Sequence, residues 1–574
     1  MLSGASGLHD SIRAVNYPAF FARNRKGNRE MSIGCRHSWC VLIIAALAGS
    51  IFVLAKPKDK DAEVKFTARA ELVLIPTLVT DKSGNHITGL KQEDFTVLEN
   101  GEEQKISTFE EISSDPQLLS RPMNPNEFGN SLAGGGSNRR ITLLVLDLIN
   151  TSFMAQANAR EELLKYLTQS VDQREPTALY TLTRNGIQVV HDFTSDPRIL
   201  VAALHQVKGD TTHDTMIDPA AVASEAQKIQ SMMGDAERNF RSFERRLAIT
   251  YTLDGLEQVA QALAGFPGRK SLIWAGGGFP FSVGDNMQLA SFGRDTLSDL
   301  LPMYEHTWQL LNNAEIALYP VDAKGLVVPM ASASVGNPGK NYGRNMNRRL
   351  MDTQANSEIF AAMTGGRAYY NSNDLVRGFR DAVNDSAEYY MLGYYLDRSK
   401  TKAGWRKLAV KVKREHTEVR ARSGFFVTNA TVDPANSRNN DISSALQSPL
   451  DFTSLALVAR WDKIEPGKEP GKKHVNYEMH LAPEAALIDD ADDNRIALDF
   501  VALAKTPDGK VVDQPAGQKI DTHLTAERLA SIRQNGLGYK GFLDLAPGEY
   551  TVRLVVRDNL SGRIGSVAAP LKVE

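Results

Sequence analysis

The sequence has 574 residues and a formal net charge of -2, so it is long enough for several domains and carries no excess of basic residues. The near-neutral charge excludes a chain that binds nucleic acid mainly through a basic surface. Hydrophobic residues make up 42% and charged residues 23% of the chain, which is typical of globular proteins. The only cysteines are Cys35 and Cys40, so the sequence beyond them has no disulfide, thiol nucleophile or cysteine-ligated zinc.

Residues 1–55 form an N-terminal region that predicts export. Residues 40–55 are uncharged and mostly apolar. The basic residues that precede this run are Arg23, Arg25, Lys26, Arg29 and Arg36. The run is short for a membrane-spanning helix, which needs about 20 residues, but it has the length of a signal-peptide core.

Two questions about this N-terminal region stay open. Val53 and Ala55 stand where a signal peptidase reads small residues, so the run is either a cleaved signal peptide or a retained membrane anchor. Translation starts at Met1 or at Met31, and the second start gives a signal of ordinary length. Each alternative places the rest of the chain outside the cytoplasm, as a periplasmic, cell-surface or secreted protein.

Residues 64–113 predict a small β domain. An apolar strand over 71–80 is followed by a turn around Gly84 and Asn85, residues that tolerate positive φ. Two further strands flank a hairpin turn at Asn100 and Gly101. Residues 114–138 are rich in Pro, Asn, Ser and Gly with little to bury, and we expect them to be a linker.

Residues 139–427 predict a domain in which strands and helices alternate, an order typical of a parallel sheet with helices on both faces. The expected strands are 141–146, 178–183, 270–274, 316–321 and 389–395. Residues 208–246 are polar and predict a helical insertion, and residues 327–350 predict a mobile loop because Gly, Asn and Arg dominate them. We expect β strands at the C-terminal end of this domain.

The C-terminal part predicts a second β domain. Residues 428–449 are polar and are expected to be a linker. Residues 450–574 contain several short apolar strands with turn signals between them, which is typical of an immunoglobulin-like β-sandwich.

The segment 141–152 carries the strongest chemical signal. Six apolar residues lead into Asp147, and Asn150, Thr151 and Ser152 follow. Ligand sites in open α/β sheets lie just beyond the carboxyl ends of the strands. A carboxylate with hydroxyl and amide oxygens nearby suits Mg²⁺ or another hard divalent cation.

Four segments resemble one family. They are LKQEDFTVL at 90–98, LDLINTS at 146–152, PGRKSLIW at 267–274 and YYMLGYY at 389–395. In this order, they are similar to the VWFA-related proteins of the acidobacterial type, which contain a von Willebrand factor type A domain. The resemblance implies an α/β fold class: a von Willebrand type A domain (Rossmann-like, with a mostly parallel sheet and helices on both faces) flanked by β-sandwich domains.

The resemblance also implies a metal-ion-dependent adhesion site with the pattern Asp-x-Ser-x-Ser after the first strand. Asp147 matches the first carboxylate, whereas Ile149 and Thr151 stand at the serine positions. Thr151 supplies a hydroxyl there, or a loop one residue longer places Asn150 and Ser152 in those roles. Thr250 matches the threonine of the second loop.

The third loop of such a site normally contributes an aspartate, and here it does not. Gly276, Gly277 and Gly278 stand at that place, so the second carboxylate is absent. One carboxylate with neutral hydroxyls is a weak Mg²⁺ site in water. Two interpretations stay open: a degenerate site completed by a carboxylate of the partner, or a hydrogen-bonded Asp147 beside a helix that Asn150, Thr151 or Ser152 caps.

Other candidate sites give weaker signals. Gly276–Gly278 lacks the Lys-Ser/Thr of a phosphate-binding loop, and no Gly-x-Ser-x-Gly or His-Glu-x-x-His motif occurs. The nearest approaches to an acid/base pair are His191 with Asp192 and His213 with Asp214, and neither has a nucleophile close in sequence. The acidic run 489–493 lacks the spacing of a Ca²⁺ loop and predicts a solvated turn.

We therefore expect an exported, non-enzymatic binding or adhesion protein without a catalytic residue. It presents the strand-end loops to a protein or cell-surface ligand, binds no nucleic acid and meets a membrane only through its N-terminal segment. The alternatives are an exported hydrolase with an unrecognised site and a purely structural envelope component.

Overall fold

The computed structural model describes residues 70–113, 124, 126–130, 140–169, 175–208, 227–284, 297–326, 339–397, 400–427, 434–483, 485, 488, 494–512 and 514–574. Within these ranges the side chains of 227–239, 241, 339–350 and 434–437 are not described. The chain divides into two compact units, Met1–Phe66 and Thr67–Glu574. All described residues belong to the second unit. The predicted signal or anchor at 40–55 lies outside the described residues. Among the residues that are described, no helix is long and apolar enough to cross a membrane.

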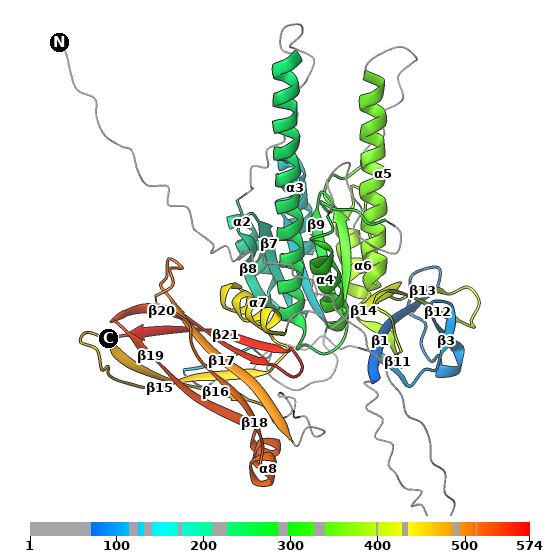
Figure 1. Cartoon of the computed structure of the whole chain (residues 1–574). Coiled ribbons are helices and arrows are strands. Elements are labelled where there is room, and N and C mark those ends of the chain that lie inside the picture. The colour runs from blue at the N-terminus through cyan, green and yellow to red at the C-terminus, as the bar shows by residue number, and fades with distance from the viewer. Residues whose placement is uncertain are drawn as a thin grey trace, which may run out of the picture. The chain divides into compact units, whose positions relative to one another are not determined.

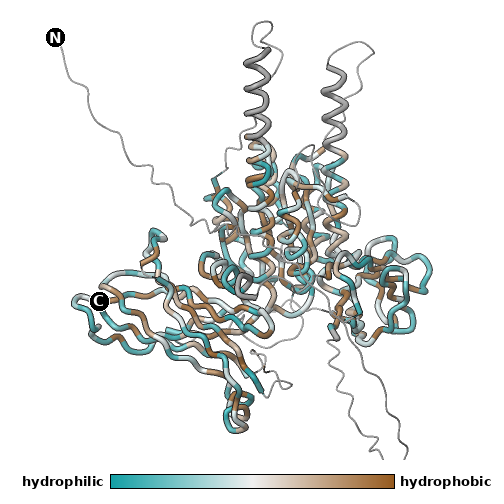
Figure 2. Tube along the Cα trace, viewed as in Figure 1, coloured by the Kyte–Doolittle hydropathy of each residue, from teal (hydrophilic) through white to brown (hydrophobic). Residues whose placement is uncertain are grey.

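Residues from the middle of the chain form a five-stranded sheet (Figure 1). Its order is β10 (Ile316–Asp322), β9 (Lys270–Gly276), β6 (Ile141–Asp147), β7 (Thr177–Thr183) and β8 (Gly186–Thr194). The first four strands are parallel, and β8 pairs antiparallel with β7 at the edge. The strands β6, β9 and β10 are buried along their whole length, because their sequences are continuous apolar runs. Figure 2 marks hydrophobic residues in brown, and they are numerous among the elements around this sheet.

Helices cover both faces of this sheet. One core joins it to α3 (Gln227–Leu263), α4 (Leu301–Asn313) and α5 (Gly339–Thr364), with Trp308 and Phe360 fully buried. The other core joins it to α1 (Phe153–Gln169), α2 (Pro197–Gln206) and α6 (Leu375–Asn384).

Two further sheets combine segments that are distant in sequence. One has the order β13 (Glu418–Arg420), β1 (Ala70–Thr80), β11 (Glu388–Asp397) and β4 (Thr108–Ser113). The other has the order β14 (Gly424–Val427), β12 (Gly404–Val412), β2 (Phe95–Glu99) and β3 (Glu102–Gln104), and a short 3-10 helix, η1 (Gln92–Asp94), precedes β2. Their apolar residues share one core. The range 64–113, predicted as a domain of its own, therefore pairs with strands from 388–427.

The C-terminal residues form two four-stranded antiparallel sheets around a common core. One contains β5 (Glu127–Gly129), β15 (Leu457–Pro466), β16 (Lys473–Leu481) and β19 (Leu537–Leu545). The other contains β17 (Arg495–Lys505), β18 (Ala516–His523), β20 (Gly548–Asp558) and β21 (Ile564–Val573). Both ranges expected to be linkers contribute structure: β5 lies within 114–138, and α7 (Pro434–Gln447) lies within 428–449. Helix α8 (Ala526–Asn535) connects β18 to β19.

The predicted fold class, a Rossmann-like type A domain with a mostly parallel sheet, is wrong for this chain. The described part contains 21 strands in five sheets but only eight α-helices, and four of the sheets are antiparallel. Within the described ranges, only the central sheet mixes parallel and antiparallel strands. The prediction gave too much weight to the strand–helix alternation of one region, whereas strands such as β2 alternate buried and part-exposed residues, as one-sided antiparallel strands do. The chain is a mixed α/β protein dominated by β structure.

Helices α3 and α5 extend beyond the carboxyl end of the central sheet (Figure 1). Residues 227–246 of the predicted insertion belong to α3, and residues 339–350 of the predicted mobile loop begin α5. Residues 209–226 and 327–338 lie outside the described ranges. Thr252 of α3 is level with the loop after β6, so Phe240 stands about 18 Å further along the helix.

The shared sheets predict that residues 70–113 do not separate as a domain. We expect that cutting the chain at a protease site inserted between 114 and 123 leaves both fragments together in size-exclusion chromatography, because β1 and β2 pair with β11 and β12. Val97→Asp, which puts a charge into the shared core where Val97 is 1% exposed, should release the N-terminal fragment. If the two fragments of the cut protein separate although Val97 is unchanged, this pairing is contradicted.

Candidate functional site

Asp147 ends the central strand β6 and is completely buried. Its Oδ1 accepts hydrogen bonds from the backbone N–H groups of Ile149 (3.0 Å) and Asn150 (2.9 Å). Its Oδ2 accepts from Asn150 Nδ2 (2.8 Å) and from the indole Nε1 of Trp274 (3.0 Å). Each carboxylate oxygen thus has two N–H donors, which is the full capacity of an ionised carboxylate.

Local sequence explains half of this arrangement. An aspartate often accepts hydrogen bonds from backbone N–H groups two and three residues later, because this forms a tight turn. Asp147 makes such a turn with Ile149 and Asn150 as the chain leaves the strand. The other half is long-range: Trp274 stands on the neighbouring strand β9, which pairs with β6 in parallel register.

Asn150 links this turn to helix α3. Its Nδ2 donates both to Asp147 and to Thr252 Oγ1 (3.0 Å). The hydroxyl of Thr252 in turn donates to the carbonyl of Ala248 (2.7 Å). The predicted second-loop residue Thr250 is not the contact residue, since its hydroxyl donates to the carbonyl of Arg246 within α3. Thr252 was missed, although it lies two residues further along the same helix.

Thr151 binds the glycine segment instead of a cation. Its Oγ1 accepts a hydrogen bond from the backbone N–H of Gly277 (2.8 Å) and is buried. Ser152 is only partly buried, and its carbonyl accepts the N–H of Gln156 in the first turn of α1. The five predicted metal ligands therefore do not converge on one point.

The three glycines allow close approach of the backbone. A Cβ at Gly276 would lie 2.9 Å from the Cβ of Asp147 and 3.0 Å from Thr151 Oγ1. At Gly277 it would lie 2.5 Å from the carbonyl oxygen of Asn150. Gly278 has φ +112°, which side-chain-bearing residues rarely adopt. The place where a second aspartate was sought has no room for a side chain.

The residues around Asp147 do not fit Mg²⁺. The ion prefers octahedral oxygen ligands and gives up its water reluctantly, whereas all four positions on this carboxylate are taken by N–H donors. Burial raises the pKa of Asp147, and the hydrogen bonds from Asn150, Trp274 and Ile149 oppose that rise. Throughout the described ranges, no group of three or more His, Cys, Asp or Glu residues is placed to hold a metal.

Asp322 is a second carboxylate at this end of the sheet, and it was not among the predicted site residues. Asp322 ends β10, and its backbone is in register with Gly276. Since β9 stands between β10 and β6, Asp322 and Asp147 are roughly 10 Å apart, too far to share one ion. Asp322 Oδ1 accepts the N–H of Lys324 (2.9 Å), and Lys324 Nζ donates to the carbonyl of Gly277 (2.6 Å). An aspartate directly after an apolar strand was the signal that could have found it.

The other predicted sites gain no catalytic partner. His191 Nδ1 lies 2.6 Å from the carbonyl oxygen of Asp192, and Asp192 accepts a hydrogen bond from Tyr180 (3.4 Å). His213, Asp214 and the acidic run 489–493 lie outside the described residues. Burial raises the pKa of Glu257 to about 8, but this carboxyl group lies between α3 and α4 beside Thr307.

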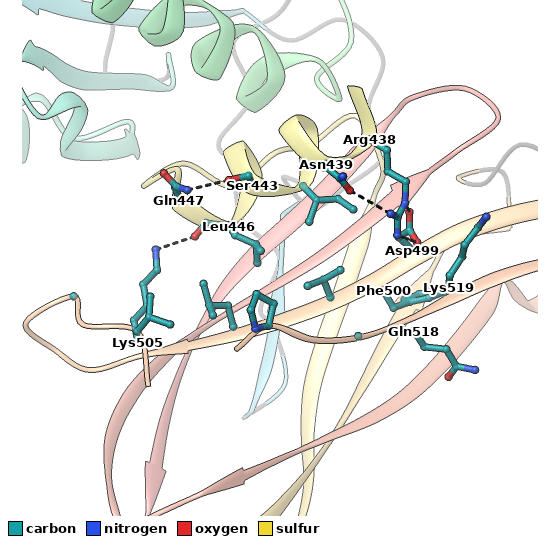
Figure 3. A pocket seen from close by; sticks show the side chains of 17 residues that line it. Arg438, Asn439, Ser443, Leu446, Gln447, Asp499, Phe500, Lys505, Gln518 and Lys519 are labelled. Carbon is teal, nitrogen blue, oxygen red and sulfur yellow. Dashed lines mark hydrogen bonds and ion pairs between the residues drawn. The ribbon is translucent and has the colours of Figure 1, made fainter. Parts of the chain in front are cut away.

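A cavity lies in the C-terminal part, away from Asp147 in sequence. It has a volume of about 860 Å³ between α7 and the strands β17 and β18. Figure 3 shows the bidentate pair of Arg438 and Asp499 at one end and Lys505 at the other. Lys505 Nζ donates to the carbonyl of Leu446 (2.8 Å) at the end of α7. These charged groups hold α7 on the sheet, so we assign the cavity no chemistry.

Comparisons with known proteins add no relative. No protein family matches the sequence, and no curated protein matches it significantly. The resemblance to the VWFA-related proteins therefore stays a prediction.

The saturated carboxylate predicts a structural, metal-independent role for Asp147. We expect Asp147→Asn to lower the free energy of unfolding by about 2 to 3 kcal/mol, because its NH2 group would face two N–H donors. Asp322→Asn, which keeps an oxygen for Lys324, should cost less. Denaturant unfolding followed by tryptophan fluorescence measures both. Mg²⁺ and EDTA should leave the wild-type curve unchanged; stabilisation by Mg²⁺ that disappears in Asp147→Asn would contradict the assignment.

Proposed function

We propose that this protein is an exported, non-enzymatic binding protein whose contact surface lies at the carboxyl end of the central sheet. It binds a protein ligand there through direct apolar and polar contacts. Export is supported by the basic residues and the apolar run at 40–55. The motifs that resemble VWFA-related proteins favour a binding role over a catalytic one.

One observation carries the proposal: large apolar side chains are exposed around this end of the sheet. They stand at the start of α1, on α3, on α5 and just after β10, and they are Phe153, Met154, Phe240, Phe243, Leu247, Met351 and Leu326. Single exposed apolar residues are ordinary, but a concentration of them on elements that meet at one edge favours a protein-interaction surface.

The most exposed of these apolar side chains lie on helices. Met154 is 77% exposed, Met351 is 65% exposed and Phe240 is 58% exposed. Phe240, Phe243 and Leu247 follow a spacing of three and four residues, which places them along one side of α3. Methionine and phenylalanine are enriched where proteins bind one another, because they supply large apolar contact area.

The buried carboxylate takes no direct part in this binding mode. Asp147 has no exposed surface, so a ligand meets the loops that it holds in place and not the carboxylate itself. The metal-dependent version of the resemblance, in which the partner's carboxylate completes a Mg²⁺ site, therefore receives no support from the geometry. The contact surface we propose does not need a cation.

The proposal predicts that this edge can be cross-linked to a specific protein of the cell envelope. A photo-reactive amino acid at Phe243 or Met154 should yield a discrete cross-linked product with an envelope extract, and excess unlabelled protein should suppress it. Phe542, which is 53% exposed on β19, provides a matched control position that should not give the product.

Three results would contradict the proposal. Equal products from Phe243 and Phe542 would mean that exposed apolar residues react without specificity. Loss of the product on addition of EDTA would show that a metal ion is needed after all. Conversion of an added substrate by the purified protein would argue for the hydrolase alternative.

A further inference from the structure

A second cavity lies where the strands built from 70–113 meet the helix α4. Its volume is about 260 Å³, and its walls come from β1, the end of α4, the turn that follows it and the segment that leads into β14. This volume lies just below the roughly 300 to 1,000 Å³ of pockets for drug-sized ligands, so the cavity suits a small molecule.

Arg422 is a buried cation at this cavity, and its Nε has no hydrogen-bond acceptor among the described residues. It is 7% exposed and belongs to the wall of the cavity. Its guanidinium carbon lies 5.4 Å from the centre of the Phe425 ring, and the carboxylates of Glu315 and Glu71 attract it electrostatically. Burial lowers the pKa of Arg422 to about 10, so the group remains positively charged at neutral pH.

Glu315 offers an unused acceptor in the same cavity. Its Oε2 is buried and has no hydrogen-bond donor among the described groups. Glu315 also has φ +51° in the turn between α4 and β10, a conformation usually filled by glycine at the end of a helix. A glutamate at such a position strains the backbone, and strained residues occur preferentially at functional sites.

Asn312 adds an unused donor beside these two groups. It is 8% exposed, and its Nδ2 is buried without an acceptor in the part of the chain that the structure describes. Three buried polar atoms of this cavity thus lack protein partners: two donors and one acceptor. Buried polar atoms nearly always have hydrogen-bond partners. Three exceptions in one cavity therefore point to a bound molecule that pairs with all of them.

We propose that this cavity binds a small zwitterion that carries both a carboxylate and an ammonium group, the chemistry of a free α-amino acid. The carboxylate lies on the guanidinium of Arg422, which can pair with both of its oxygens, and accepts a further hydrogen bond from Asn312. The ammonium group donates to Glu315. This inference is independent of the binding surface at the sheet edge.

Charge in the cavity selects against simpler anions. Arg422 supplies one positive charge, whereas Glu71 and Glu315 supply two carboxylates along the wall. A multiply charged ion such as phosphate is repelled by them, while a zwitterion places opposite charges against opposite charges. Leu72, Leu74 and Phe425 provide apolar wall for the carbon skeleton.

Calorimetric titration of the full-length protein with glycine, L-alanine and L-glutamate tests the proposal. Acetate, methylammonium and inorganic phosphate serve as probes for each charge alone. We expect at least one amino acid to bind, and acetate and methylammonium to bind more weakly by about 30-fold or more. Absence of binding by all three amino acids would overturn the proposal, as would acetate or phosphate binding as tightly as the amino acids.

Two variants separate binding from folding. Glu315→Gly should weaken amino-acid binding by about 30-fold or more while leaving the melting temperature unchanged or higher, because glycine adopts positive φ without strain. Asn371→Gly, at another position with positive φ (54°), is the matched control that should bind normally. Arg422→Met should also lose binding; if it fails to fold, Glu315→Gly still decides. Binding that survives Glu315→Gly would overturn the proposal.

Discussion

The carboxylate of Asp147 organises the carboxyl end of the central sheet. Moving a charged group into the protein interior is costly unless hydrogen bonds replace the lost water. Asp147 meets this requirement with four N–H donors, two from its own turn, one from Asn150 and one from Trp274. Because Asn150 also contacts Thr252, the same carboxylate fixes the turn, the strand β9 and helix α3 against one another.

This constraint explains the sequence around it. The glycines at 276–278 leave space for the turn after β6 to press against the end of β9, with Thr151 accepting the N–H of Gly277. What resembles a damaged metal site is a close-packed junction of two loops. Such a junction keeps the start of α1 and the part of α3 around Thr252 in fixed places, which a surface that binds by shape needs.

The sequence predicted the local parts of this structure well. The strands β6, β9 and β10 were found because fully buried strands are continuous apolar runs. The position of Asp147 at a strand end followed from the same pattern. The pairing of β1 with β11 was not predicted, because sequence periodicity carries no information about partners some 300 residues away.

The candidate sites show the same limit. That Trp274 would fill the last acceptor position of Asp147 depends on the parallel register of two strands, which no local motif encodes. The cavity at Arg422 was missed for a related reason: its distinguishing property is a set of buried polar atoms without hydrogen-bond partners among the described residues, and only the three-dimensional arrangement reveals this. Thr250 was chosen over Thr252 because both lie in one helix turn and only packing distinguishes them.

The most direct test of this account is the NMR signal of the Trp274 indole N–H in protein labelled with ¹⁵N-tryptophan, which has only five such residues. The account predicts that this N–H, bound to Asp147, exchanges slowly with solvent and that its signal does not move when Mg²⁺ is added. A rapidly exchanging signal, or one that Mg²⁺ shifts, would show that the carboxylate is free to hold an ion and would contradict the account.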